Sequence, residues 1–146
     1  MAQISTVAVS RKNIPKGEVQ NQARGISRSF TPTSFSANVT SGDNILICNL
    51  DKDARIIGAS VSISGAVGLA GGFCQLRVTE NSVSTPLTEP LSTTYAGTVG
   101  MTAATPSVDR RYTKTVELLV GGNSIDSTAT GTIEVTIHHD FYKAAG

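Results

Sequence analysis

Three adjacent residues near the C-terminal end, His138, His139 and Asp140, are of types that bind metals or transfer protons. They fall in the alternating run TIEVTIHHDFY, residues 132–142, which is typical of a β-strand. Successive strand residues point to opposite faces, so the two imidazoles are not placed to share a metal ion. His138 and Asp140 lie on one face, about 7 Å apart along the strand, and His139 lies on the apolar face. The pattern therefore predicts a polar pair and a buried histidine.

The two cysteines, Cys48 and Cys74, each lie inside an apolar run. A nucleophilic cysteine needs a nearby base and electropositive surroundings, and the interior of an apolar strand offers neither. We therefore predict two buried, reduced thiols, with a disulfide as the alternative. Asp51 and Asp53 flank a lysine but lack the further oxygen ligands and the glycine of a calcium loop, which favours a charged turn. Neither G-x-S-x-G nor H-E-x-x-H occurs. The sequence thus predicts no enzyme, no metal and no cofactor.

The glycine-rich stretch GAVGLAGG, residues 65–72, is the remaining candidate for chemistry, as a phosphate-binding loop. It lacks the Gly-Lys-Ser/Thr ending of a P-loop and the G-x-G-x-x-G spacing of a dinucleotide site. A strand pattern follows it, so no helix N-terminus is available to bind an anion. We interpret the stretch as a wide turn whose small residues allow close backbone approach, with Val67 and Leu69 exposed.

The composition favours strands over helices. Ser, Thr and Gly account for 48 of the 146 residues, and this mixture disfavours helices but suits strands with polar outer faces and tight turns. The clearest alternating runs are NILICNL, GASVSIS, CQLRVTE, TKTVELLV and TIEVTIHHDFY. The Thr-rich run STTYAGTVG, residues 92–100, is expected to form an edge strand.

The fold prediction is an all-β protein, an antiparallel β-sandwich of jelly-roll or immunoglobulin-like type with an extended N-terminal arm. Residues 1–42 are assigned to the arm and residues 43–146 to the sandwich. The residues predicted to form the core share the inward side of the alternating runs; they are Val61, Ile63, Leu76, Val78, Val116, Leu118, Val135 and Ile137.

The net charge of +1 hides an uneven distribution. The arm has five basic residues against the single acidic Glu18, a net charge of +4, and the remainder carries −3. Blocks of one sign often act as interaction tails, so we expect the arm to bind an acidic surface, with a solvated tail as the alternative. The candidate partner-binding residues are Arg11, Lys12, Lys16, Arg24 and Arg28. Nucleic acid is not expected as a partner, because these charges are diluted and few aromatic residues accompany them.

The sequence gives no indication of a membrane. No run of about 18 apolar residues is present, and the N-terminus lacks the apolar centre of a secretory signal. We therefore expect the protein to be made in the cytoplasm and not to be exported by a secretory signal.

The order of these features resembles a known class of virion proteins. A polar arm is followed by DARIIGASVSISGAVGLAGGFCQLRV, a Thr/Ala-rich middle and a final GTIEVTIHHDFY. Over roughly residues 43–142 this is similar to the β-sandwich capsid decoration, or cement, proteins of tailed bacteriophages. The resemblance implies a non-enzymatic protein on the capsid surface, made in the host cytoplasm, that stabilises the assembled head. It also implies a homo-oligomer, a dimer or trimer, that contacts the major capsid protein or a neighbouring virion protein.

A second class of function stays open, a carbohydrate- or host-recognition module of a phage tail or fibre. Sugar-binding sandwiches usually present exposed aromatic rings. Here Trp is absent and the three tyrosines, Tyr95, Tyr112 and Tyr142, are scattered. The composition therefore favours the decoration protein.

Overall fold

The computed structural model describes residues 3–4, 24–35, 38–102 and 111–141. In this part of the chain nearly all regular structure is β, and the helical element is a short 3-10 turn, η1 (Pro32–Ser34). That turn is far too short to cross a bilayer, so no helix of the described residues spans a membrane. The strands are β1 (Gln3–Ile4), β2 (Arg24–Phe30), β3 (Asn44–Leu50), β4 (Ala54–Ile63), β5 (Phe73–Glu80), β6 (Val83–Pro86), β7 (Leu91–Ser92), β8 (Gly97–Gly100), β9 (Lys114–Gly121) and β10 (Ile133–Phe141).

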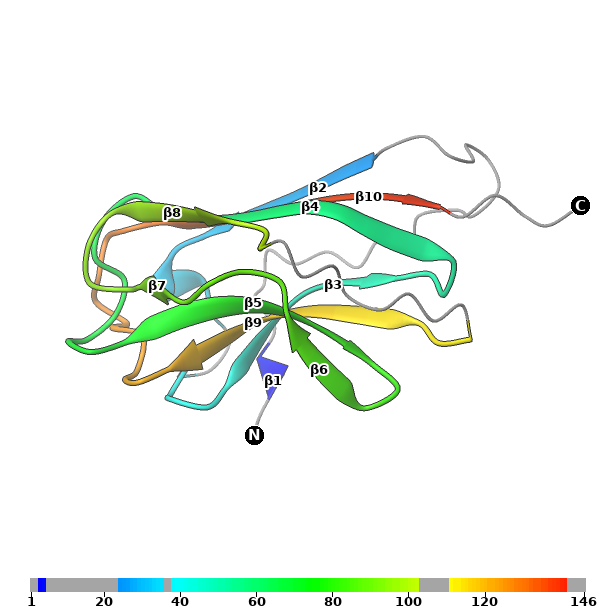
Figure 1. Ribbon diagram of the computed structural model, residues 1–146. Coiled ribbons are helices and arrows are strands. Elements are labelled where there is room, and N and C mark those ends of the chain that lie inside the picture. The colour runs from blue at the N-terminus through cyan, green and yellow to red at the C-terminus, as the bar shows by residue number, and fades with distance from the viewer. Residues whose placement is uncertain (1–2, 5–23, 36–37, 103–110, 142–146) are drawn as a thin grey trace, which may run out of the picture.

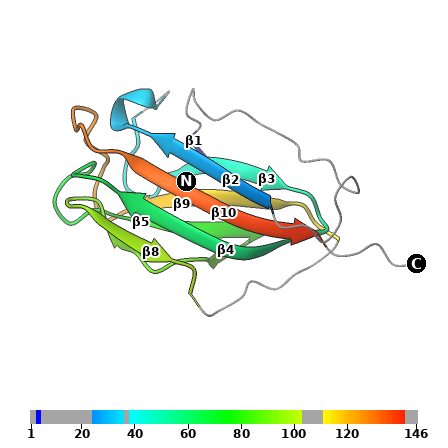
Figure 2. The same cartoon turned by 90° about the horizontal axis from the view of Figure 1, so that it is seen from above.

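The strands form two stacked sheets (Figure 1). One has the order β2-β10-β4-β8, and the other has the order β1-β3-β9-β5-β6 with β7 paired to β5. Figure 2 shows the first sheet from above. Every pairing is antiparallel except the short parallel contact of β1 with β3. The predicted all-β sandwich is confirmed.

The pairing pattern identifies the sandwich as a jelly roll. The strands pair in the nested order β5–β6, β4–β8, β3–β9 and β2–β10. This is the order of one long hairpin, with β5 and β6 nearest its tip, whose successive strand pairs lie alternately in the two sheets. Eight strands connected in this way, β2-β10-β4-β8 in one sheet and β3-β9-β5-β6 in the other, define the jelly roll; β1 and β7 are additions to the second sheet. The sequence had left this open against an immunoglobulin-like sandwich.

The core lies between the sheets and follows the predicted alternation. All eight predicted core residues are buried, and their strand neighbours point outward. Val67, which was expected to be exposed, is fully buried, whereas Leu69 is exposed. The expectation for Val67 was wrong because the turn folds inward: its N–H donates to the carbonyl of Thr93, and its carbonyl accepts from the N–H of Asp126.

The sandwich begins earlier than the predicted boundary at residue 43. All seven residues of β2 pair with β10, and Ile26 and Phe30 join the core. Val39, also within the segment assigned to the arm, is buried in the same core. Part of the expected arm is thus sheet. The expected edge strand within residues 92–100 is confirmed, because β8 lies at the edge of its sheet.

The strands bring the loops together at two ends of the sandwich. We call the end with segments 31–35, 38–43, 64–72 and 122–132 the glycine end. The opposite end, with turns 51–53 and 81–82 and the start of β9, is the charged end.

Candidate functional site

The His138–Asp140 segment does not form the predicted polar pair. Asp140 is buried and forms a bidentate ion pair with Arg55. The Nε and Nη2 atoms of Arg55 donate to the two carboxylate oxygens of Asp140, at 2.9 and 2.7 Å. A bulge between His138 and His139, where Ile57 is the extra residue of β4, changes the register at this point. His138 is exposed, and His139 is fully buried as predicted. Across the described residues, no three His, Cys, Asp or Glu side chains are placed to hold a metal ion.

The two cysteines are free and buried, as predicted. Burial raises the pKa of each thiol to about 12, and for Cys48 the nearby positive charge of Arg28 opposes this rise. Since the thiolate is the reactive form, neither cysteine is activated as a nucleophile at neutral pH.

The glycine-rich turn is a packing element, as the sequence predicted. A Cβ atom on Gly68 or Gly72 would collide with the side chain of Thr93, and one on Gly122 would collide with the carbonyl of Gly71. The backbone N–H groups that a phosphate cradle would use are already engaged, those of Val67 and Gly68 by the carbonyl of Thr93. Through these close approaches the loops of the glycine end pack tightly against one another.

The predicted partner-binding residues fall into two groups. Arg24 and Arg28 belong to β2, where they pair in register with His139 and Val135 of β10. Arg11, Lys12 and Lys16 lie outside the described residues. The structure therefore places two of the five in the sandwich itself.

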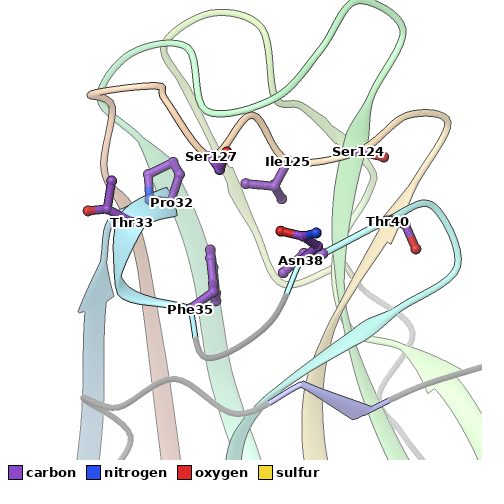
Figure 3. Close-up of a pocket in the computed structure, with 9 residues that line it drawn as sticks. Pro32, Thr33, Phe35, Asn38, Thr40, Ser124, Ile125 and Ser127 are labelled. Atoms are coloured by element: carbon purple, nitrogen blue, oxygen red, sulfur yellow. The ribbon is translucent and has the colours of Figure 1, made fainter.

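An open groove of about 640 Å³ lies at the glycine end (Figure 3). One wall comes from η1 and the segment after it, and the other from the segment between β9 and β10. All of its lining residues are uncharged; they are Pro32, Thr33, Phe35, Asn38, Val39, Thr40, Ser124, Ile125 and Ser127.

The floor of the groove is apolar and fixed. Val39 and Ile125 are buried, and the N–H of Ile125 donates to the carbonyl of Val39 at 3.1 Å. The ring of Phe35 packs edge-to-face on Phe30, with ring centroids 5.4 Å apart. Asn38 is exposed, and its amide lies in the middle of the groove between the two walls (Figure 3). The groove thus offers apolar surface together with a polar amide.

Two carboxylates stand at the margins of the groove. Asp43 accepts hydrogen bonds from the backbone N–H and the hydroxyl of Thr40, at 3.0 and 3.2 Å. Asp126, between two lining residues, accepts from the N–H and the hydroxyl of Thr128. These hydrogen bonds lower the pKa of Asp126, which keeps it ionised at neutral pH. Negative charge therefore lies next to residues that line the uncharged groove.

Sequence reasoning did not find this groove. Its walls are more than 80 residues apart in sequence, and nothing in the two segments indicates that they meet. The signal that was available is the close spacing of Phe30 and Phe35, two of the four phenylalanines of the chain, beside Pro32.

Comparison with known proteins shows the fold. No protein-family model matches the chain, and no curated protein matches it in sequence. A chain in the solved capsid of Ralstonia phage GP4 is similar in structure, with a TM-score of 0.66 and 16% sequence identity. The match covers 98% of this chain and 100% of that one. A chain in the capsid asymmetric unit of cyanophage Pam1 matches with a TM-score of 0.50 and 20% identity, over 91% and 94% of the two chains.

Proposed function

We propose that this protein is a non-enzymatic structural protein of a bacteriophage virion, of the decoration or cement type, which binds and stabilises the assembled head. The observation that carries the proposal is the end-to-end structural match with a chain of a phage capsid, with no large segment left over in either chain. The two chains therefore share one fold over their matched length. Jelly rolls recur in viral capsid proteins.

The partner is the major capsid protein or a neighbouring virion protein on the capsid surface. Arg11, Lys12 and Lys16 supply positive charge from the segment before β2, and Arg24 and Arg28 supply it from β2. One exposed ion pair contributes only about 0.2–1 kcal/mol, so tight binding needs many contacts at once. A homo-oligomer, a dimer or trimer, provides them because its linked copies bind together.

Deletion of residues 1–23 tests the proposed docking: it keeps all of β2 and removes, besides the basic segment, only the two-residue strand β1 from the described sheets. We expect the deleted protein to fold, with strand-dominated circular dichroism, and to lose its binding to heads assembled without this chain. Full occupancy of the heads by the deleted protein would contradict the role of the arm. Binding of the intact protein should also weaken as salt screens the charges.

A matched pair of variants tests whether head binding depends on the positive charges of the arm or only on the net charge of the protein. Replacement of Lys12 and Lys16 by Ser is expected to reduce head binding. Replacement of Lys52 and Arg111 by Ser removes the same charge from exposed residues of the sandwich and is expected to leave binding intact.

The second candidate is a carbohydrate-recognition module of a tail or fibre. Tyr95 favours it, because this residue is 68% exposed and offers a ring for stacking on a sugar. Immunogold labelling of the chain on intact particles separates the two, since the decoration protein labels the head and the recognition module labels the tail.

A further inference from the structure

We propose that the groove at the glycine end binds residues 11–16 of a second copy of this chain, the sequence RKNIPK. This inference rests on the proposed function in taking the basic arm as the docking element. It goes further by naming the surface that receives the arm, so that each copy both inserts an arm and accepts one.

The apolar part of this segment fits the floor of the groove. Ile14 and Pro15 are adjacent, and the residue before a proline is biased towards an extended conformation. An extended segment of this kind loses little conformational freedom on binding, and apolar grooves lined by aromatic residues recognise proline-containing segments. Phe35 and Ile125 offer the apolar contact, and the amide of Asn38 is placed to hydrogen-bond an extended backbone.

The charges of the segment complement the margins of the groove. Arg11 and Lys12 precede the apolar pair and Lys16 follows it, so positive charge flanks the apolar pair on both sides. Asp43 and Asp126 provide negative charge at the margins, and no lining residue is basic. An apolar centre with charged flanks therefore meets an apolar floor with oppositely charged margins.

The position of β2 favours a second copy over the same chain. β2 runs from Arg24 to Phe30, about 20 Å, and the groove begins beyond Phe30, so Arg24 lies at the opposite end of the strand. Only seven residues separate Lys16 from Arg24, and this length of chain spans at most about 29 Å. β1 holds Gln3 and Ile4 beside Asn44 and Ile45, at the glycine end of the same chain, so the constraint comes from the C-terminal side of the segment. With residues 11–16 in their own groove, residues 17–23 would have to cover more than about 20 Å back to Arg24, which uses most of their length and costs conformational entropy. The groove of a neighbouring copy can lie closer to Arg24, which relaxes this requirement.

Disulfide trapping between two differently tagged copies tests the contact. One copy carries Ile14→Cys and the other carries Ser127→Cys, at an exposed lining residue. The native cysteines are buried, with pKa values of about 12, and do not compete. Under mild oxidation we expect the intermolecular disulfide to form at least ten times faster than with Ser82→Cys, an exposed control at the charged end. Equal rates for the two would overturn the proposal.

The choice of a second copy is tested with a single chain that carries both Ile14→Cys and Ser127→Cys. We expect its disulfides to link different chains, and their formation to slow on dilution. A disulfide within one chain, formed at a rate independent of concentration, would overturn the exchange between copies.

A charge variant gives a second readout without cysteines. Ser127→Lys places a positive charge against the arm, and Ser82→Lys makes the same change at the charged end. Sedimentation velocity should show self-association weakened at least tenfold by Ser127→Lys and unchanged by Ser82→Lys. Unchanged association of both variants would contradict the docking.

These experiments use purified protein and no virions, so a negative result for the exchange of arms can be distinguished from a negative result for the virion role. If neither disulfide nor association depends on the groove but the protein still binds heads, the exchange of arms is wrong and the virion role stands. If the arms exchange but purified virions lack the chain, the virion role is wrong and the exchange stands.

Discussion

The two ends of the sandwich use their polar groups in opposite ways. At the charged end, polar groups are turned inward: the buried Lys114 ammonium donates to the carbonyl of Lys52 at 2.9 Å and lies 3.5 Å from Glu80. This single side chain joins the β3–β4 turn, the end of β5 and the start of β9. At the glycine end, close backbone packing holds the loops instead, and the groove between them is lined by uncharged residues.

The difference supports the proposed docking at the glycine end. A buried ion pair that loses one member leaves an uncompensated charge, so the charged end has little freedom to change its contacts. The glycine-end loops are held by close backbone packing and by short polar side chains such as Asn123, and Asn38 and Phe35 line the groove. Loops that are fixed before binding lose less entropy when a partner docks. This contrast supports the proposed division, with structural support at the charged end and docking at the glycine end.

The largest effect is expected from Lys114→Met at the charged end. The variant leaves Glu80 and the Lys52 carbonyl without the ammonium, and breaking a buried pair in this way costs about 3–5 kcal/mol of the free energy of unfolding. Urea denaturation measures it, with Lys52→Met as the exposed control, for which a change within about 0.5 kcal/mol is expected. A loss below about 1 kcal/mol for Lys114→Met would show that the charged end does not depend on this contact.

The two thiols report whether one end opens before the other. Cys74 lies near the glycine end of β5, and Cys48 lies in β3 opposite Val116 of β9. A rise in pKa from 9.0 to about 12 lowers the thiolate fraction at pH 8 about a thousandfold. We expect both to alkylate slowly and at the same rate, measured by mass spectrometry of the native protein. Faster labelling of one thiol would show that its end opens independently.

The same shift sets a pH dependence of stability. Because the folded pKa values lie above the unfolded value of 9.0, the unfolded chain releases its thiol protons first as the pH rises. The free energy of unfolding should therefore fall between about pH 9 and pH 12. Cys48→Ala should reduce this fall, and urea denaturation at several pH values will test it. An unchanged pH dependence in the variant would contradict the assignment.

At the glycine end, Gly122→Ala is expected to cost about 2–3 kcal/mol. Gly122 has a φ of 73°, and an added Cβ would meet the carbonyl of Gly71, so conformational strain and a backbone clash combine. Gly42→Ala is the matched control, with a φ of 98° and open space around it, and should cost about 1 kcal/mol. Equal losses would mean that the close packing of the loops contributes nothing.

The smallest effect is expected from Arg55→Met, which removes the ion pair with Asp140. The Arg55 side chain is 43% exposed, so solvent screens the pair and the expected loss is about 1 kcal/mol. The loss should shrink further in high salt, as thermal unfolding at two ionic strengths will show. A salt-independent loss above about 3 kcal/mol would place this pair among the buried contacts of the charged end.

The features predicted correctly from the sequence are those that depend on local periodicity, namely the strands and their buried faces. Alternation in CQLRVTE and TKTVELLV determined the core residues correctly, because one face of each strand is buried. It did not reveal β2, because the run RGISRSF places Arg28 on the same side as Ile26 and Phe30 and shows only two apolar residues. Only the register with β10 makes this segment a strand.

The groove could not be predicted for a different reason. Its two walls come from the segment around Phe35 and the segment around Ile125, and they meet only once the jelly roll has brought the ends of β2 and β9 together. The buried Lys114 gave a partial signal, since it shares the inward side of its strand with Val116. Its partners on two other turns depend on the tertiary structure.

The central claim is that this jelly roll is a virion protein that decorates the capsid, and cryo-electron microscopy of the native particle tests it most directly. The account predicts density for the sandwich of β2–β10 on the outer surface of the head, repeated in many copies. Particles that carry the disulfide between Ile14→Cys and Ser127→Cys should show the same arrangement as untreated particles. Particles whose heads are complete without this density, or that carry it only on the tail, would contradict the account.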